Sequence, residues 1–326
     1  MADASDPSTL PPVLIDTILH KGCKMILSGS SKAGKTLALM HLGLAAANGL
    51  SWMGHKINQE CKVVYLDFEL VPRLAKERIK EVIQHPDNNY TPTKNYLYCG
   101  LRGQNRSLDE LALHIQNLKD FNPDLVIVDP FYKLGGEYDE NDAGSVSAVL
   151  NKMERFSERL GCAFVYAHHF SKGNKSETDH IDRASGSGVF ARDPDAILTL
   201  TPHEEEYHLV LEGTLRNFPT PDKQVVEFSW PNFIHKPDLE ANLRKPGQAA
   251  ESKKLNESLA DKLLGLLEKG QIIGFNVMRI KLQDLTNNEI TKGRLKNILR
   301  LLKGKIDVQE RGRGIETIYS AKLKLQ

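Results

Sequence analysis

One stretch of eight residues, GSSKAGKT at Gly29–Thr36, restricts the possible folds of this chain more than any other part of the sequence. It matches the pattern G-x-x-x-x-G-K-[ST], and it lies between a β-rich run, KMILSG, and a helix-favouring segment, LALMHLGLAAAN. A strand that passes through a glycine-bearing turn into a helix directs backbone N–H groups and the positive helix end at a phosphate. The motif therefore predicts a nucleotide-binding α/β domain.

The side chains of this P-loop have separate expected roles. Lys35 is expected to neutralise the β- and γ-phosphates of ATP, and the Thr36 hydroxyl is expected to bind Mg²⁺. The predicted nucleotide-binding set is Gly29, Ser30, Ser31, Lys32, Ala33, Gly34, Lys35 and Thr36.

Short runs rich in Val, Ile and Leu alternate with helix-compatible segments along the chain. Near-continuous apolar runs of this length, spaced by helices, are typical of a mainly parallel sheet covered on both faces. After Leu200 the residues alternate between apolar and polar, which predicts an antiparallel edge. The β-rich runs are at 24–29, 62–69, 124–129, 163–169 and 195–200.

Acidic residues stand at the ends of two of these runs. Asp129 follows four apolar residues in DLVIVD, and a buried carboxylate there is costly unless a cation or hydrogen bonds compensate it. We predict that Asp129 is the Walker B ligand of Mg²⁺. Because Pro130 follows it, the catalytic base is expected elsewhere: Glu69 in YLDFEL is preferred, with Asp67 as its competitor.

The charge of the chain is unevenly distributed. Residues 251–326 carry 16 Lys and Arg against 9 Asp and Glu, a net +7, whereas the other 250 residues carry 27 against 33, a net −6. The basic end is predicted to meet a polyanion, and a solvated basic face is the alternative. We expect a flexible tail at 1–12, an ATPase domain at 13–235, a linker at 236–258 and a second domain at 259–326.

Six segments in order resemble those of the RecA-like ATPases, and within them the hexameric plasmid replicative helicases of the RepA type. The resemblance covers about residues 13–230 and implies a RecA-like fold, a ring or filament of identical subunits with ATP between them, and Glu69 as the catalytic glutamate. The segments are LIDTILHKGCKMILSGSSKAGKT, YLDFEL, VIVDPFYKLGG, YAHHFSKG, ASGSGVFARDPDAIL and LRNFP.

The resemblance also assigns the residues around YAHHFSKG. His169 matches the position that contacts the γ-phosphate and reports its presence to the loop that follows, while His168 is expected to pack in the core. Arg216 matches an arginine finger that enters the neighbouring subunit's site, with Arg192 as the alternative. The loop is expected to contact single-stranded DNA through Lys172, Lys175 and Arg183.

The C-terminal end resembles a winged-helix domain. Helical segments at 257–270 and 291–305 precede a hairpin with the tip RGRG, which offers basic side chains to DNA, although such domains also serve as protein-binding modules. The predicted contacts are Lys292, Arg294, Lys296, Arg311 and Arg313.

Two functions are compatible with these features. The first is an ATP-driven motor that translocates on single-stranded DNA as a hexameric ring and unwinds duplex for replication of a mobile element. The second is an ATP-gated DNA-binding regulator or loader. Widely spaced cysteines and the lack of an apolar run of membrane-spanning length predict a cytoplasmic protein with no membrane partner.

Overall fold

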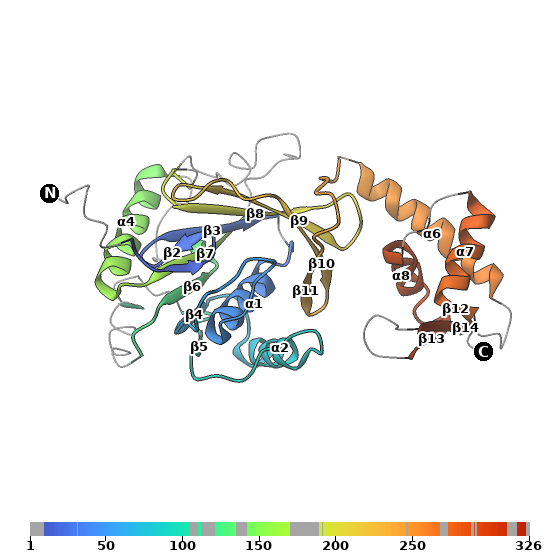
Figure 1. Cartoon of the computed structure of the whole chain (residues 1–326), viewed down its shortest axis with the longest axis horizontal. Coiled ribbons are helices and arrows are strands. Elements are labelled where there is room, and N and C mark those ends of the chain that lie inside the picture. The colour runs from blue at the N-terminus through green and yellow to red at the C-terminus, as the bar shows by residue number, and fades with distance from the viewer. Residues whose placement is uncertain are drawn as a thin grey trace. The chain divides into compact units, whose positions relative to one another are not determined.

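The computed structural model separates the chain into two compact units (Figure 1). One comprises Met1–Pro202 and Tyr207–Leu243, and the other comprises His203–Glu206 and Arg244–Gln326. The structure describes residues 10–30, 32–104, 110–111, 121–134, 142–169, 189–190, 192–245, 247–267, 273–287, 290, 292–311 and 318–323.

The first unit is organised around one large sheet. Among the described residues this sheet has nine strands in the order β11-β10-β9-β8-β3-β7-β6-β4-β5. Strands β3 to β8 are parallel to their neighbours within this group, and β9, β10 and β11 extend the sheet antiparallel from β8. The strands are β3 (Lys24–Gly29), β4 (Val63–Asp67), β5 (Tyr96–Gly100), β6 (Leu125–Asp129), β7 (Ala163–His169), β8 (Ala196–Pro202), β9 (His208–Leu215), β10 (Gln224–Ser229) and β11 (Asn232–His235).

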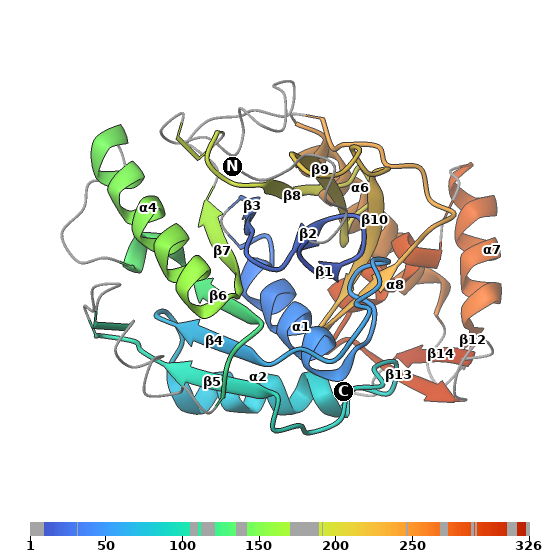
Figure 2. The ribbon, with the colours of Figure 1, turned by 60° about the vertical axis from the view of Figure 1, so that its left-hand side comes forward.

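Helices cover both faces of this sheet, because successive side chains of a strand point to opposite sides. Met25 and Leu27 of β3 pack in the core that contains α1 (Lys35–Asn48) and α2 (Pro72–Gln84). Ile26 packs in the second core, together with α4 (Ala143–Leu160). Figure 2 shows α4 apart from α1 and α2. The predicted α/β fold, with a mainly parallel sheet flanked by helices, is confirmed.

Smaller elements complete this unit. A short hairpin of β1 (Val13–Ile15) and β2 (Leu19–His20) precedes β3, and a 3₁₀ turn, η1 (Phe131–Lys133), follows β6. Gly43 allows α1 to approach β5 closely, since a Cβ atom there would lie 2.6 Å from the Tyr96 ring.

The second unit has its own apolar core, to which α6, α7 and α8 all contribute. In the described part of this unit, an antiparallel sheet of three strands has the order β12-β14-β13. None of the helices in the described ranges is long and apolar enough to cross a membrane. The elements are α6 (Gln248–Leu266), β12 (Ile273–Gly274), α7 (Phe275–Thr286), α8 (Lys292–Leu301), β13 (Ile306–Arg311) and β14 (Ile318–Leu323).

Two boundaries differ from the predicted ones. The linker expected at 236–258 is shorter, because α6 begins at Gln248, and Leu255, Leu259 and Leu263 pack one helical face into the core of this unit. The turn between β8 and β9 belongs to the second unit although it lies inside the domain predicted at 13–235.

Two side-chain amides and Arg244 connect this turn to the rest of the second unit. Glu206 accepts hydrogen bonds from Asn256 Nδ2 at 2.9 Å and Asn297 Nδ2 at 3.0 Å. The Arg244 guanidinium donates to the carbonyl oxygens of His203 and Glu205. Such pairing between distant segments cannot be read from a run of sequence.

Candidate nucleotide site

The P-loop joins the carboxyl end of β3 to the amino end of α1. Gly34 precedes the helix with a φ of +84°, a left-handed conformation that strongly favours glycine. The Lys35 side chain returns over the loop, and its Nζ donates to the carbonyl oxygens of Gly29 and Ser30 at 2.9 Å each. Ser31 lies outside the described residues. The motif thus forms the strand–loop–helix that the sequence predicts.

Lys35 is buried, and its surroundings favour the neutral form of its amine more than water does. The side chain is only 6% exposed, and burial lowers its pKa to about 8, against the opposing effect of the carboxylates of Asp129 and Glu69. A buried ammonium gains most from an anion that approaches it, since water competes little there. This geometry suits a phosphate between Lys35 and the first turn of α1.

Asp129 lies at the carboxyl end of β6, where it is 1% exposed. The Tyr65 hydroxyl donates to Asp129 Oδ2 at 2.8 Å and lies 3.2 Å from the carbonyl oxygen of Thr36. Burial raises the pKa of Asp129 to about 6, although hydrogen bonds from Tyr65 and the Thr36 side chain oppose the rise. A buried carboxylate beside a threonine hydroxyl is a donor set that fits Mg²⁺.

The two candidate bases, at the end of β4 and just after it, have different surroundings. Asp67 is fully buried: its Oδ1 accepts from the backbone amides of Glu69 and Leu70 at 2.8 and 2.9 Å, and its Oδ2 accepts from the Tyr98 hydroxyl at 2.9 Å. Oδ1 of Asp67 thus holds the turn that follows β4, and Oδ2 connects β4 to β5. Glu69 is exposed, and its charge acts on the pKa of Lys35 and of Asp129. The surroundings favour Glu69 over Asp67 as the carboxylate available to a ligand.

The two adjacent histidines end β7 beside the P-loop strand. His169 pairs in register with Gly29, so its backbone reaches the edge of the sheet where the P-loop begins, while its side chain lies outside the described part of the chain. His168 is 7% exposed and stacks on Phe190, with ring centroids 4.0 Å apart. The expectation that His168 packs in the core is confirmed.

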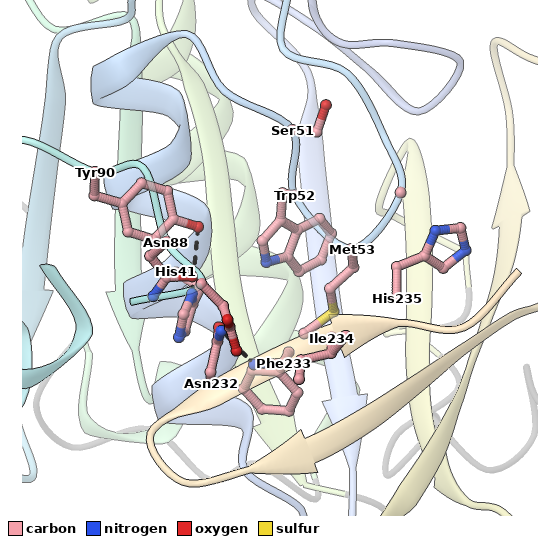
Figure 3. A pocket seen from close by; sticks show the side chains of 12 residues that line it. His41, Ser51, Trp52, Met53, Asn88, Tyr90, Asn232, Phe233, Ile234 and His235 are labelled. Atoms are coloured by element: carbon pink, nitrogen blue, oxygen red, sulfur yellow. Dashed lines mark hydrogen bonds between the residues drawn. The ribbon is translucent and has the colours of Figure 1, made fainter. Parts of the chain in front are cut away.

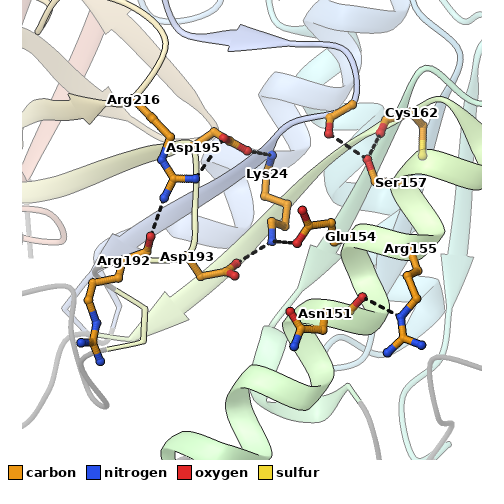
Figure 4. A network of polar contacts seen from close by, with 11 residues as sticks. Lys24, Asn151, Glu154, Arg155, Ser157, Cys162, Arg192, Asp193, Asp195 and Arg216 are labelled. Carbon is orange, nitrogen blue, oxygen red and sulfur yellow. Dashed lines mark hydrogen bonds and ion pairs between the residues drawn. The ribbon is translucent and has the colours of Figure 1, made fainter. Parts of the chain in front are cut away.

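Arg216 lies at the other end of the strands from the P-loop, in the polar network of Figure 4. It directly follows β9, whose Leu215 pairs with Ala196 at the beginning of β8. The Arg216 guanidinium lies 3.6 Å from Asp195 Oδ1 and donates to the backbone oxygen of Arg192. The side chain of Arg192, the alternative finger, extends away from Arg216 in the same view.

The predicted DNA contacts fall largely outside the described side chains. Arg294 and Lys296 lie on α8, where both are half-buried. The backbones of Lys292 and Arg311 belong to α8 and β13, but their side chains are not described. Outside the described residues lie Lys172, Lys175, Arg183 and Arg313.

A cavity of about 350 Å³ lies beside α1 (Figure 3). His41, on its wall, contacts Tyr90 Oη at 3.3 Å and the carbonyl oxygen of Pro231 at 3.0 Å. Burial lowers the pKa of His41 to about 4, so the neutral ring donates to Pro231 and accepts from Tyr90. The contact with Pro231 fixes the turn between β10 and β11 on α1, and the contact with Tyr90 fixes the segment between α2 and β5, so His41 has a structural role.

Sequence reasoning missed the tyrosines beneath the site. Tyr65 and Tyr98 donate to Asp129 and Asp67, the paired carboxylates at the ends of β6 and β4. Tyr65 lies two residues before Asp67, hence on the same side of β4. That spacing was the only available signal, since the partner strands are distant in the sequence.

Comparisons with known proteins give one matching family model and similar solved structures. An AAA domain family model, AAA_25, matches residues 1–175 of the 326 residues, which is more than half of the chain. The KaiC-like protein PH0186 of the hyperthermophilic archaeon Pyrococcus horikoshii is 14% identical, with a TM-score of 0.49 over 70% of this chain and 96% of that chain.

A DnaB-like replicative helicase, described with its interactions with primase, is 13% identical, with a TM-score of 0.48 over 66% of this chain and 59% of that chain. No curated protein matches the sequence. The family match and the strand–loop–helix at Gly29–Thr36 point to the same nucleotide chemistry. The chain belongs to the AAA domain family and is a P-loop ATPase whose α/β core agrees with the RecA-like fold expected from its sequence.

Proposed function

We propose that the chain is an ATP-hydrolysing helicase or translocase of the RepA type that acts on DNA as a ring of identical subunits. The observation that carries the proposal is that the candidate residues lie at opposite ends of the strands of one sheet, which we call its carboxyl edge and its amino edge. Lys35, Asp129 and Glu69 lie at the carboxyl edge of the parallel strands, whereas Arg216 lies at the amino edge.

The separation of the two edges follows from the strand register. Leu215 pairs with Ala196, Ala196 pairs with Met25, and the P-loop begins at Gly29, at the far end of β3. At about 3.3 Å per residue, the backbone at Arg216 and the start of the P-loop are roughly 17 Å apart along the strand direction. Because its side chain is also bound to Asp195, Arg216 is unsuited to the P-loop of its own chain.

An arginine at this edge is suited to the site of a second copy. The carboxyl edge of one subunit then faces the amino edge of the next, a head-to-tail contact that generates a closed ring or a filament. Arg216 would stabilise the charge that develops on the transferred phosphoryl group, and Glu69 would accept the proton of the attacking water. We propose the hexameric ring.

Asp129 and Thr36 are the residues that would hold Mg²⁺, and their contact, together with the burial of Asp129, supports that assignment. The bound ion would supply positive charge at the β- and γ-phosphates. Lys35 binds and orients the same phosphates, and Asp67 fixes the turn from which Glu69 extends.

Two features support DNA as the partner. His169, which ends β7, pairs in register with Gly29, and the proposed DNA contacts at Lys172, Lys175 and Arg183 follow His169 in the sequence. In the second unit, the order α6-β12-α7-α8-β13-β14 is the one expected of a winged-helix domain, in which α8 is the recognition helix.

The proposal is tested by measuring ATP turnover with and without DNA. Single-stranded DNA of any sequence is expected to stimulate ATPase activity several-fold, and the enzyme is expected to displace one strand of a duplex that has a single-stranded tail. Activity that is unchanged by every DNA tested would contradict the proposal.

A second candidate function is favoured by the same element order in the C-terminal unit. An ATP-gated regulator or loader would use α8 to select a duplex sequence, with nucleotide controlling assembly. Stimulation restricted to particular duplexes, without strand displacement, would support this function over the motor.

A further inference from the structure

At the amino edge, Asp195 joins the amino ends of β3 and β8 to the carboxyl end of β9, which Arg216 follows. Its Oδ2 accepts from the backbone amide of Lys24 at 2.9 Å, and its own amide donates to the Lys24 carbonyl at 2.9 Å. Its carbonyl accepts from the Arg216 amide at 2.8 Å, and its Oδ1 lies 3.6 Å from Arg216 Nη1. One residue therefore fixes both the backbone and the guanidinium of Arg216.

A buried cation braces the same edge. The Lys24 side chain is 6% exposed, and its Nζ pairs with Asp193 Oδ1 at 2.7 Å and with Glu154 Oε2 at 3.2 Å. The network in Figure 4 connects β3 with α4 and with the residues before β8. Because Lys24 is held from both sides, the amide that it presents to Asp195 has a fixed position.

The Arg216 side chain needs such support. It is 54% exposed, and a long exposed side chain loses considerable rotamer entropy when it must adopt one conformation. Contacts that hold the guanidinium in advance remove this cost from the encounter with a phosphate. The carboxylate of Asp195 and the carbonyl oxygen of Arg192 engage only part of its five N–H donors among the described residues.

We propose that Asp195 is a positioning residue for the ATPase reaction, which orients Arg216 toward the nucleotide of the neighbouring subunit. This inference rests on the proposed role of Arg216 in trans. Asp195 itself contacts no substrate. It acts through Arg216 on the nucleotide site of another copy of the chain.

The substitution Asp195→Asn tests this role. The amide oxygen still accepts from the Lys24 amide, but the negative charge facing Arg216 is lost. We expect kcat to fall about tenfold with the KM for ATP unchanged, since a small misplacement of a catalytic group is costly while ATP binding depends on Lys35 and the P-loop. An unchanged kcat would overturn the inference.

Asp124 offers a closely matched control. It also precedes a strand at this edge, its Oδ2 accepts from the Lys62 amide at 2.9 Å, and its Oδ1 pairs with Lys21 at 2.7 Å. Both carboxylate side chains are 19% exposed. Asp124→Asn is expected to lower the unfolding temperature at least as much as Asp195→Asn does, while kcat stays at the parent value. An equal loss of kcat in both variants would reduce Asp195 to a structural role.

Dilution into an excess of Glu69→Gln subunits distinguishes action in trans from action in cis. Each Asp195→Asn subunit then has a neighbour with intact Asp195 and Arg216, and its turnover should rise to that of parent subunits diluted in the same way. Turnover that stays low would place the defect in the subunit's own site and overturn the inference.

Arg216→Ala subunits, diluted into the same excess of Glu69→Gln subunits, distinguish a failure of the positioning role of Asp195 from a failure of the proposed role of Arg216 in trans. If they recover and Asp195→Asn subunits do not, only the positioning role fails. If Arg216→Ala subunits do not recover although mixed assemblies form, the proposed function in trans fails. Should Asp195→Asn not fold, Asp195→Ser, which retains an acceptor for the Lys24 amide, is measured by the same scheme.

Discussion

The Walker B position should limit the stability of the nucleotide-free protein. Asp129 is fully buried, and burial raises its pKa from the usual 3.8 to about 6. The folded state therefore binds this proton more tightly than the unfolded chain does, and stability falls as pH rises from about 3.8 to about 6. At 1.36 kcal/mol for each pH unit, the charged form costs about 3 kcal/mol at neutral pH.

Asp129→Asn removes this cost while retaining an oxygen that accepts the Tyr65 hydroxyl. In urea unfolding with EDTA and no nucleotide, the variant should exceed the parent by up to about 3 kcal/mol at pH 7.5 and by about half of that at pH 5, where Asp129 is mostly protonated in the fold. It should also lose Mg²⁺-dependent ATPase activity. A variant that is no more stable than the parent at pH 7.5, or a difference that does not shrink toward pH 5, would refute this reasoning.

Three further substitutions separate binding, chemistry and coupling. Lys35→Ala should abolish turnover and weaken ATP binding by roughly 10- to 100-fold, the effect of losing one charge-assisted phosphate contact. Titration with a fluorescent nucleotide measures the affinity, and an unchanged affinity would contradict the P-loop assignment. Glu69→Gln should retain ATP affinity and lose turnover, since the amide cannot accept a proton, and parent-level hydrolysis would return attention to Asp67. His169→Ala should keep ATP affinity but lose the stimulation of ATPase activity by single-stranded DNA. His168→Ala should mainly lower the unfolding temperature. Equal stimulation of ATPase activity in His169→Ala and the parent would exclude the sensor role.

The parallel core could be predicted because its signals are local. The P-loop and four further apolar runs each carry their own strand signature, and Asp129 is recognisable because it ends such a run. Strand β5 escaped prediction because its residues are only half-buried at the edge of the sheet, so YLYCG lacks a continuous apolar character. Local pattern thus indicates buried strands better than edge strands.

Interactions between distant segments could not be predicted in the same way. The preference for Glu69 was available from its position in the sequence, but the hydrogen bond that engages Asp67 comes from the Tyr98 hydroxyl on a neighbouring strand. The position of Arg216 at the amino edge depends on the register of β9 against β8. Both facts require the sheet order, which a single sequence does not contain.

The most direct test of a site shared between two subunits is complementation between two inactive variants. Arg216→Ala subunits lack the proposed finger and Glu69→Gln subunits lack the proposed base, so only interfaces that join an intact Glu69 to a neighbour's intact Arg216 are complete. With mixed assembly verified by native mass spectrometry, we expect partial recovery of ATPase activity that is absent from either variant alone. Mixed assemblies without any recovered activity, or a monomer that is fully active at every concentration, would contradict a site shared between two copies of the chain.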